Sequence, residues 1–245
     1  FQIAVWKRLL VHFIASFSSI YFLGGLAPIV LYGFTLDFGL LNDVIIIIFL
    51  VWMINLYNFM DGIDGMAISG AVFVSGTMIW VLLWTHPESE FIIVMALLLA
   101  SSSAFMLFNW PPASIFMGDA GSTFLGYLFG PLILVTVMVG DVTICTWLVV
   151  FGYFFADIIV TQIMRVILVK KWYLAHRSHA YQNFARITNN HLKVTVWAIV
   201  YYLMWLLPLT IWSVIKPDMA VFATIMALTP ASIFSYKYGP VLSIK

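Results

Sequence analysis

The sequence predicts an all-α fold, a polytopic integral membrane bundle of about eight transmembrane helices. Of the 245 residues, 64% are hydrophobic and 9% are charged, and the mean hydropathy is +1.07. Apolar runs of spanning length continue from one end of the chain to the other. This composition excludes a soluble globular protein. The net charge of +1 comes without a basic patch, so no nucleic-acid partner is expected.

Eight segments reach the length of about 17–25 residues that a helix needs to cross a bilayer. No repeat, low-complexity tract or linker divides them, so we interpret residues 1–245 as one helical domain. In chain order, the expected spans are residues 8–27, 43–60, 66–85, 90–109, 121–139, 143–168, 194–215 and 218–236.

Local signals mark the ends of several spans. Asn42 and Asp43 are expected to cap the second span. Pro111 and Pro112 end the fourth, because proline cannot continue a helix. The fifth opens near Asp119, where a carboxylate complements the positive end of the helix.

Two spans carry signals in their interior. Gly126 and Gly130, in the fifth, form a Gly-x-x-x-Gly pattern that close helix packing explains fully. Asp157, near the middle of the sixth, is a functional candidate, a partner for a polar group on a neighbouring helix, or the mark of a helix break. Cys145 is expected to be a small core residue, without a disulfide.

The distribution of basic residues predicts the orientation in the membrane. Lys216 stands alone at one set of span ends, whereas the opposite ends carry Lys7, Arg8, Lys170, Lys171, Arg177, Arg186, Lys193, Lys237 and Lys245. Since positive charge favours the cytoplasmic side, we expect these segments in the cytoplasm: residues 1–7, 61–65, 110–120, 170–193 and 237–245.

The first polar motif follows the apolar run 44–54. It consists of four side chains at three-residue steps, Asn55, Asn58, Asp61 and Asp64. On a helix this spacing places all four on one broad face, and Gly62 and Gly65 allow the backbone to open there. Carboxylates beside amides suit magnesium, which in turn holds phosphates. The alternative is a polar helix end at which Asp61 or Asp64 caps the next helix.

The second motif runs from Asn109 to Ser122 and contains Phe116-Met-Gly118-Asp119-Ala-Gly-Ser122. Its glycines would let backbone N–H groups meet an anion at the start of the fifth span. Helix capping by Asp119 or Ser122 is the structural alternative.

The third motif is His176-Arg177-Ser-His179-Ala-Tyr181-Gln182, in a basic loop. Its charge suits anionic headgroups or a diphosphate. A solvated positive-inside loop would explain the lysines, but not two histidines around an arginine. A zinc site is disfavoured, because no thiolate and no third histidine other than His191 lies near.

These three motifs, in this order, resemble the polyprenyl-phosphate N-acetylhexosamine-1-phosphate transferases of glycosyltransferase family 4, which are related to phospho-N-acetylmuramoyl-pentapeptide transferase. The third motif is similar to the branch that initiates O-antigen or capsule synthesis. The resemblance implies a multi-pass protein of the bacterial inner membrane with its active site on the cytoplasmic face. It implies transfer of a sugar 1-phosphate from a UDP-N-acetylhexosamine to undecaprenyl phosphate, with release of UMP.

The resemblance also implies roles for individual residues. Asp119 would hold Mg²⁺, with Mn²⁺ as the alternative ion. Catalytic roles fall to Asp119, Asp61, Asp64, His176, Arg177 and His179. Substrate contacts fall to Asn55, Asn58, Gly62, Asn109, Phe116, Gly118, Tyr181 and Gln182. Partners are the two substrates and the lipid bilayer, and a homodimer is left open.

One feature departs from the family pattern. An Asp-Asp motif is expected shortly before the helix that begins near Arg8, yet no acidic residue precedes Asp37. We therefore expect this chain to lack the amino-terminal spans. The rival interpretation is a secondary transporter with a substrate site at a broken helix. Asp157 and the glycine-bearing helices favour this interpretation. A non-catalytic scaffold would leave the three motifs unexplained.

Overall fold

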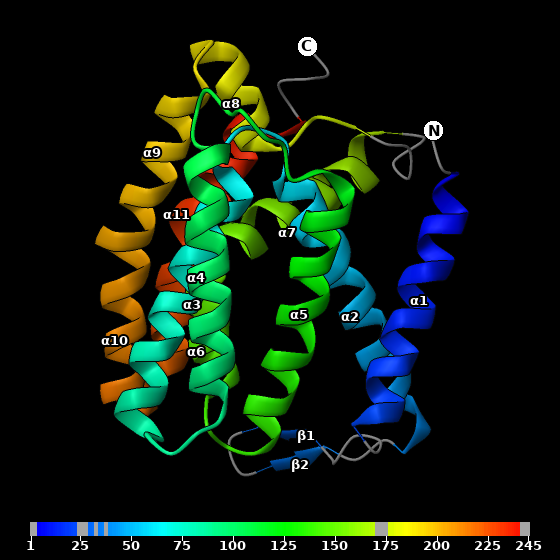
Figure 1. Ribbon diagram of the computed structural model, residues 1–245, viewed down its shortest axis with the longest axis vertical. Coiled ribbons are helices and arrows are strands. Elements are labelled where there is room, and N and C mark those ends of the chain that lie inside the picture. Colours follow the sequence, from blue (N-terminus) through cyan, green and yellow to red (C-terminus); the bar gives the residue numbers. More distant parts are fainter. Residues whose placement is uncertain (1–3, 24–28, 32–33, 37–38, 170–175, 241–245) are drawn as a thin grey trace. The chain divides into compact units, whose positions relative to one another are not determined.

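The computed structural model describes residues 4–23, 29–31, 34–36, 39–169 and 176–240 (Figure 1). The predicted basic positions Lys170, Lys171 and Lys245 lie outside these ranges, as does the end of the first predicted span. Within them the chain is helical apart from one antiparallel hairpin, in which β1 (Ile29–Leu31) pairs with β2 (Phe34–Leu36). The hairpin joins two apolar helices, α1 and α2.

The helices follow the predicted segments closely. They are α1 (Val5–Phe22), α2 (Leu40–Met60), α3 (Met66–Thr85), α4 (Phe91–Asn109), α5 (Gly118–Met138), α6 (Ile144–Val150), α7 (Gly152–Leu168), α8 (Ala180–Thr188), α9 (His191–Tyr201), the π-helical turn η1 (Tyr202–Leu206), α10 (Leu207–Ile215), the 3₁₀ turn η2 (Pro217–Met219) and α11 (Ala220–Tyr238).

The prediction of a polytopic helical membrane protein is confirmed. Among the described residues, six helical segments are long and apolar enough to cross a membrane, and the pair α6–α7 makes a seventh if it counts as one span. Helix α1 is not in this set, although an eighth span was predicted there. Its charged residues Lys7 and Arg8 and the polar His12 make it less apolar than the others.

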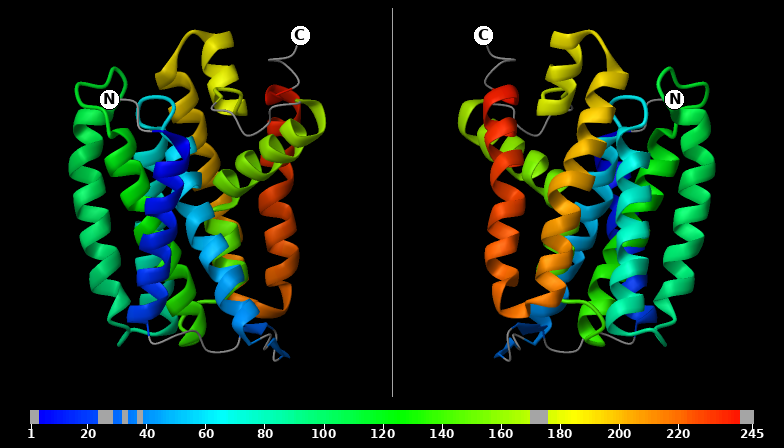
Figure 2. Two further views of the ribbon diagram at one scale, coloured as in Figure 1. Left: turned by 90° about the vertical axis from the view of Figure 1, so that its right-hand side faces the viewer. Right: turned by 90° about the vertical axis from the view of Figure 1, so that its left-hand side faces the viewer.

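The sixth predicted span, residues 143–168, is broken rather than continuous. Helices α6 and α7 are bent by 80° at Phe151, whose backbone leaves the helical range at φ −84° and ψ 6°. Its ring stacks on those of Trp147 and Phe155, with centroids 6.0 and 5.3 Å away. The oblique course of the yellow-green α7 is visible in Figure 2. Asp157 therefore lies on the second half of a broken helix.

The described residues fall into two compact units, and the first comprises residues 1–58 and 118–141. Its helices α2 and α5 pack closely at the predicted glycine pair. A Cβ atom on Gly126 would lie 2.7 Å from Cα of Ile54, and one on Gly130 would lie 2.8 Å from Cδ2 of Leu50. The interpretation of these glycines as packing residues is confirmed.

The second unit comprises residues 59–117 and 142–245. Helix α3 packs along α4, and α11 packs against α6, α7, α8 and α10. The loops 61–65 and 110–117, helix α8 and the end of α11 gather at one end of this unit (Figure 2). The turn between α3 and α4 and the turn between α10 and α11 lie at the opposite end. This alternation agrees with the connections expected from the sequence.

Candidate functional site

The first motif does not form one helical face. Helix α2 ends at Met60, so Asp61 and Asp64 lie in the following loop. Gly65, with φ +75°, precedes α3, and no side chain caps that helix. The left-handed backbone conformation at Gly65 favours glycine and directs the chain into α3. The expectations of a shared face and of an aspartate cap are therefore both wrong.

In the first unit, Asn58 and Asp119 meet a residue that the motifs do not include. Arg8 places Nη1 3.3 Å from Oδ2 of Asp119 and donates from Nη2 to Oδ1 of Asn58 at 3.0 Å. Asn58 Nδ2 in turn donates to Oδ1 of Asp119 at 2.9 Å and to Oγ of Ser122 at 3.1 Å. We call Arg8, Asn58, Asp119 and Ser122 the exposed cluster.

The exposed cluster keeps its charges close to water. The Asp119 side chain is 66% exposed and that of Arg8 is 34% exposed. Arg8 looked like ordinary positive-inside charge in the sequence. The sequence signal that could have identified Arg8 as a site residue is that it lies one helical turn before His12 on the same predicted helix. Asn55, the other predicted amide, donates to the Val51 carbonyl at 2.7 Å and lies 3.4 Å from Nδ1 of His12.

Asp64 ties together three segments of the second unit. Its Oδ2 accepts a hydrogen bond from the Ala113 N–H at 3.1 Å and lies 3.4 Å from Nδ1 of His191. Its backbone carbonyl accepts from Thr195 Oγ1 at 2.7 Å. The loop 61–65 is thus fixed to the loop after α4 and to the start of α9. Asp61 is half-buried in the same loop.

Asn109 has a structural place in this unit. Its Oδ1 accepts from the Gly65 N–H at 3.0 Å, and its Nδ2 donates to the Ile115 carbonyl at 2.9 Å. The side chain is buried, so its amide holds the two loops together. A substrate contact for Asn109 finds no support in this geometry.

Gly62 is explained by close packing on α8. A Cβ atom there would overlap Nε2 of Gln182 and the hydroxyl of Tyr181. That hydroxyl donates to the Phe59 carbonyl at 2.6 Å, and Tyr181 is fully buried. Gly62 therefore lets α8 dock on the loop. Phe116, in contrast, is 74% exposed, and Gly118 begins α5 with φ +62°.

A cavity of about 620 Å³ opens beside the loop 61–65 within the second unit. Arg177, Arg186, Asp64 and His191 give it charged or titratable walls. Arg186 donates to the backbone carbonyl of Arg177 and, at 3.1 Å, to Oδ1 of Asn183. The lining residues are Gly62, Ile63, Asp64, Pro111, Pro112, Arg177, Gln182, Ala185, Arg186, Asn189, Asn190, His191 and Leu192.

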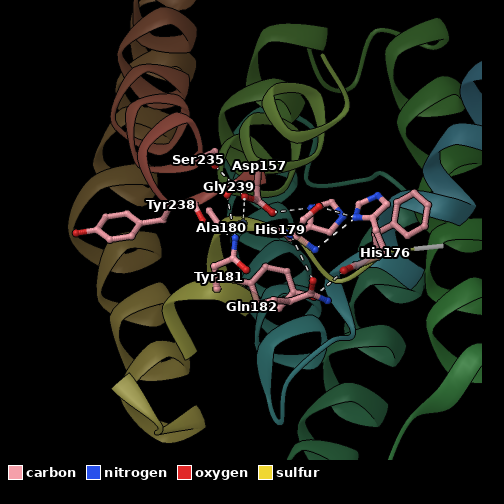
Figure 3. Close-up of polar contacts among 12 residues, drawn as sticks. Asp157, His176, His179, Ala180, Tyr181, Gln182, Ser235, Tyr238 and Gly239 are labelled. Atoms are coloured by element: carbon pink, nitrogen blue, oxygen red, sulfur yellow. Dashed lines mark hydrogen bonds and ion pairs between the residues drawn. The ribbon is translucent and has the colours of Figure 1, made fainter. Parts of the chain in front are cut away.

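His176 and His179 have different surroundings in the third motif (Figure 3). Nδ1 of His176 lies 2.9 Å from Oγ of Ser178 and accepts from the Ser178 N–H at 3.4 Å. The pKa of His176 is lowered to about 3, mainly by burial and to a smaller extent by the neighbouring His179 and Arg165. His176 is therefore neutral at pH 7. His179 is buried, and its Nδ1 lies 3.0 Å from Oδ2 of Asp157.

Asp157, His179 and Ser235 form a second polar group, which we call the buried cluster. Oδ1 of Asp157 accepts from Ser235 Oγ at 2.9 Å and from the Ala180 N–H at 3.1 Å. Of the alternatives that the sequence left open for Asp157, pairing with neighbouring polar groups is what the structure shows. The helix break lies six residues earlier, at Phe151.

In the exposed cluster, the carboxylate of Asp119 is the group that suits a magnesium ion. Within the described ranges, no three His, Cys, Asp or Glu side chains converge as metal ligands. Asp119 nevertheless offers an exposed carboxylate. Asn58 turns its NH₂ group toward Asp119 and Ser122 and its Oδ1 toward Arg8, and the buried Ser122 hydroxyl donates to the Gly118 carbonyl. Mg²⁺ is commonly held by one or two carboxylates together with substrate phosphates and water, so one exposed carboxylate suffices on the protein side.

Comparison with known proteins connects this chain to one family. Residues 1–138 match the model of glycosyl transferase family 4. Relatives include the phospho-N-acetylmuramoyl-pentapeptide-transferases of Kosmotoga olearia, 34% identical over 49% of this chain and 38% of the relative, and of Thermotoga petrophila, 38% identical over 43% and 34%. That of Streptococcus agalactiae is 30% identical over 44% of this chain and 32% of the relative.

The chain thus spans well under half the length of these relatives. The family match itself covers more than half of the 245 residues, including the first two polar motifs. The chain belongs to glycosyl transferase family 4.

Proposed function

We propose that the protein transfers an N-acetylhexosamine 1-phosphate from a UDP-sugar to a polyprenyl phosphate, such as undecaprenyl phosphate, and releases UMP. The observation that carries this proposal is the exposed cluster, in which Asp119 stands beside Arg8 and Asn58 within the family-matched part of the chain. The named relatives are transferases of a phosphorylated sugar, which supports the same class of reaction.

The reaction brings two polyanions together, and their repulsion must be offset. Transfer of a phosphoryl group requires positioning and charge neutralisation more than covalent chemistry. Asp119 would hold Mg²⁺ or Mn²⁺, which when bound would neutralise charge on the diphosphate. Arg8 adds a permanent positive charge at the same cluster, because its guanidinium faces the carboxylate of Asp119 through Nη1 and donates to Asn58 through Nη2.

Within the second unit, the cavity beside the loop 61–65 would itself suit anionic groups. Arg177 is exposed at its wall and offers a planar fork that suits phosphate oxygens. His176, being neutral, would serve as a hydrogen-bonding group rather than as a cation. Asp61, Asp64, Tyr181 and Gln182 would then shape the substrate side of this loop region.

We also propose where the reaction takes place and which branch of the family the protein belongs to. The basic ends of the spans support an active site on the cytoplasmic face of the bacterial inner membrane. The His176–Gln182 motif supports the branch that initiates O-antigen or capsule repeat units, and hence a lipid-linked precursor of a surface polysaccharide.

The test is release of UMP by the purified full-length protein in nanodiscs. The assay contains undecaprenyl phosphate, MgCl₂ and one of several UDP-N-acetylhexosamines, and mass spectrometry detects the lipid diphosphate sugar. We expect equal amounts of UMP and lipid product with at least one donor, and neither without the lipid phosphate. Absence of UMP with every donor would contradict the proposal and favour a transporter.

A further inference from the structure

Asp157 is a fully buried carboxylate for which the proposed reaction has no role. It lies on α7 with 0% of its side chain exposed. Burial of a carboxylate lowers the stability of the fold unless its oxygens accept hydrogen bonds. The presence of Asp157 at this position therefore needs a physical explanation. Its three contacts, drawn in Figure 3, provide one.

The two carboxylate oxygens of Asp157 contact different groups. Oδ1 accepts hydrogen bonds from the Ala180 N–H and from Ser235 Oγ, at 3.1 and 2.9 Å. Oδ2 faces Nδ1 of His179 at 3.0 Å. A carboxylate can only accept, so a proton must lie between these last two atoms. The geometry therefore assigns the proton of His179 to Nδ1.

The other ring nitrogen of His179 is left unpaired by the described residues. Nε2 is buried, and no hydrogen-bonding group within the described ranges reaches it. The ring is held between neighbours, with the centroids of His176 and Phe59 at 5.1 and 5.7 Å. An unpaired buried nitrogen on a fixed ring is unusual in a native structure, and it points to a ligand group.

We propose that Asp157 is a positioning residue that holds His179 in the Nδ1–H tautomer, so that Nε2 accepts a hydrogen bond from a substrate hydroxyl. This inference rests on the proposed function. Two sources offer that chemistry. One is a hydroxyl of the UDP-sugar, and the other is the P–OH group of a singly ionised lipid phosphate. A carboxylate that fixes the tautomer and orientation of a histidine is a well-understood device in enzymes.

A purely structural role for Asp157 is the competing explanation. Ala180 is the first residue of α8, so Asp157 also satisfies a free N–H at the start of that helix. Helix α8 has other attachments, however. Asn183 Nδ2 donates to the carbonyls of Tyr238 and Gly239 at 2.8 and 2.9 Å. Loss of the carboxylate should therefore leave α8 docked on α11.

The substitution Asp157→Asn separates the two roles. The amide oxygen can still accept from Ala180 and Ser235, which preserves the helix contact. The amide NH₂ faces Nδ1 as a donor, which forces the proton of His179 onto Nε2. Ser235→Ala is the matched control, because it removes one contact of the same carboxylate and leaves the tautomer unchanged.

Nitrogen-15 NMR of histidine-labelled full-length protein reads the tautomer directly, and His179→Gln assigns the signal. We expect Nδ1–H in the parent and in Ser235→Ala, and Nε2–H in Asp157→Asn. In the parent, UDP-N-acetylglucosamine or undecaprenyl phosphate, added separately, should shift the Nε2 signal, and the probe that does so identifies the source. UMP release by Asp157→Asn should fall on the order of 10- to 100-fold, as for other residues that orient a functional histidine.

An Nε2–H tautomer in the parent would overturn the inference, as would an Nε2 signal that neither probe shifts. Unchanged UMP release by an Asp157→Asn protein with the altered tautomer would overturn it as well. A parent that binds a probe at Nε2 but releases no UMP would instead contradict the proposed function, so the two failures are distinguishable.

Discussion

The carboxylates of Asp119 and Asp157 each contact a basic side chain and a neutral polar one, yet their surroundings are opposite. Asp119 pairs with Arg8 and Asn58 and is 66% exposed. Asp157 pairs with His179 and Ser235 and is 0% exposed. Exposed ion pairs contribute about 0–1 kcal/mol to stability, whereas a buried polar group that loses its hydrogen-bond partner costs about 1–3 kcal/mol.

This difference in burial suggests different roles for the two clusters, substrate binding for the exposed one and structural support for the buried one. The fold gains little from keeping Asp119 and Arg8 together, so these residues are free to bind ligands that carry charge. Asp157 supports the fold through its contacts with Ala180 and Ser235, and in our proposal it also positions His179. Substitutions in the two clusters should therefore have different signatures, and the following four predictions test that contrast.

The largest expected effect is loss of turnover in Asp119→Asn. Removal of the carboxylate that would hold the neutralising metal ion should lower UMP release by about 100- to 1,000-fold. The melting temperature should stay within about 2 °C of the parent, because the residue is exposed. Glu88→Gln, an exposed carboxylate in the turn between α3 and α4, is the control and should leave both values unchanged. Near-normal turnover by folded Asp119→Asn protein would break the contrast.

Gly126→Ala tests whether the exposed cluster rests on a rigid helix pair. A methyl group there would meet backbone atoms of Met53 and Ile54, so we expect a loss of about 1–3 kcal/mol in the free energy of unfolding. Turnover should fall as well, because α5 carries Asp119 and α2 carries Asn58.

Gly76→Ala provides the matched control. The nearest atom to its new methyl group is Cδ1 of Leu99, at 3.7 Å, which is ordinary contact. Alanine also favours helix over glycine by about 0.8–1 kcal/mol, so this variant should be as stable as the parent or more stable. Equal stability of the two variants would show that α2 and α5 separate without cost.

Arg8→Lys sharpens the contrast within the exposed cluster. Lysine keeps the charge but cannot contact Asp119 and Asn58 through two coplanar N–H groups. We expect turnover to fall roughly 5- to 10-fold, comparable to the loss of one ordinary hydrogen bond, with an unchanged melting temperature. Lys7→Arg, at the neighbouring position, should be neutral. Full activity of Arg8→Lys would mean that only the charge matters.

The smallest expected effect concerns pH and the buried side of the comparison. Burial lowers the pKa of His176 from 6.5 to about 3. Between these values the unfolded chain binds more protons than the folded protein, so stability falls as the pH is lowered through this window. His176→Asn keeps an acceptor for Ser178 but does not titrate. Its melting temperature should therefore drop less between pH 7 and pH 4.5 than that of the parent, as measured by differential scanning fluorimetry.

The sequence was sufficient for the features that depend on local pattern. Apolar runs predicted the long helices, Gly126 and Gly130 predicted a close helix contact, and the basic span ends agreed with the alternation of loops in the second unit. The three polar motifs also led to the family, because their residue types and order are specific.

Features that depend on long-range contacts were not predictable in this way. A break was one of the alternatives that Asp157 raised, but its position at Phe151, six residues earlier, has no proline to mark it. Arg8 meets Asp119 across more than one hundred positions, and a lone arginine near a span end resembles topogenic charge. The hydrogen bond from Ser235 to Asp157 joins two apolar helices whose hydropathy does not predict that they pair.

Binding of Mn²⁺ tests the central claim most directly, namely that the exposed cluster, and not the buried one, holds the metal and the reacting phosphates. Free Mn²⁺ is measured by electron paramagnetic resonance while the ion is titrated into full-length parent, Asp119→Asn and Asp157→Asn in the presence of a UDP-sugar. The account predicts one tightly bound ion in the parent and in Asp157→Asn, and loss of that ion in Asp119→Asn. Equal binding by Asp119→Asn and the parent would contradict it.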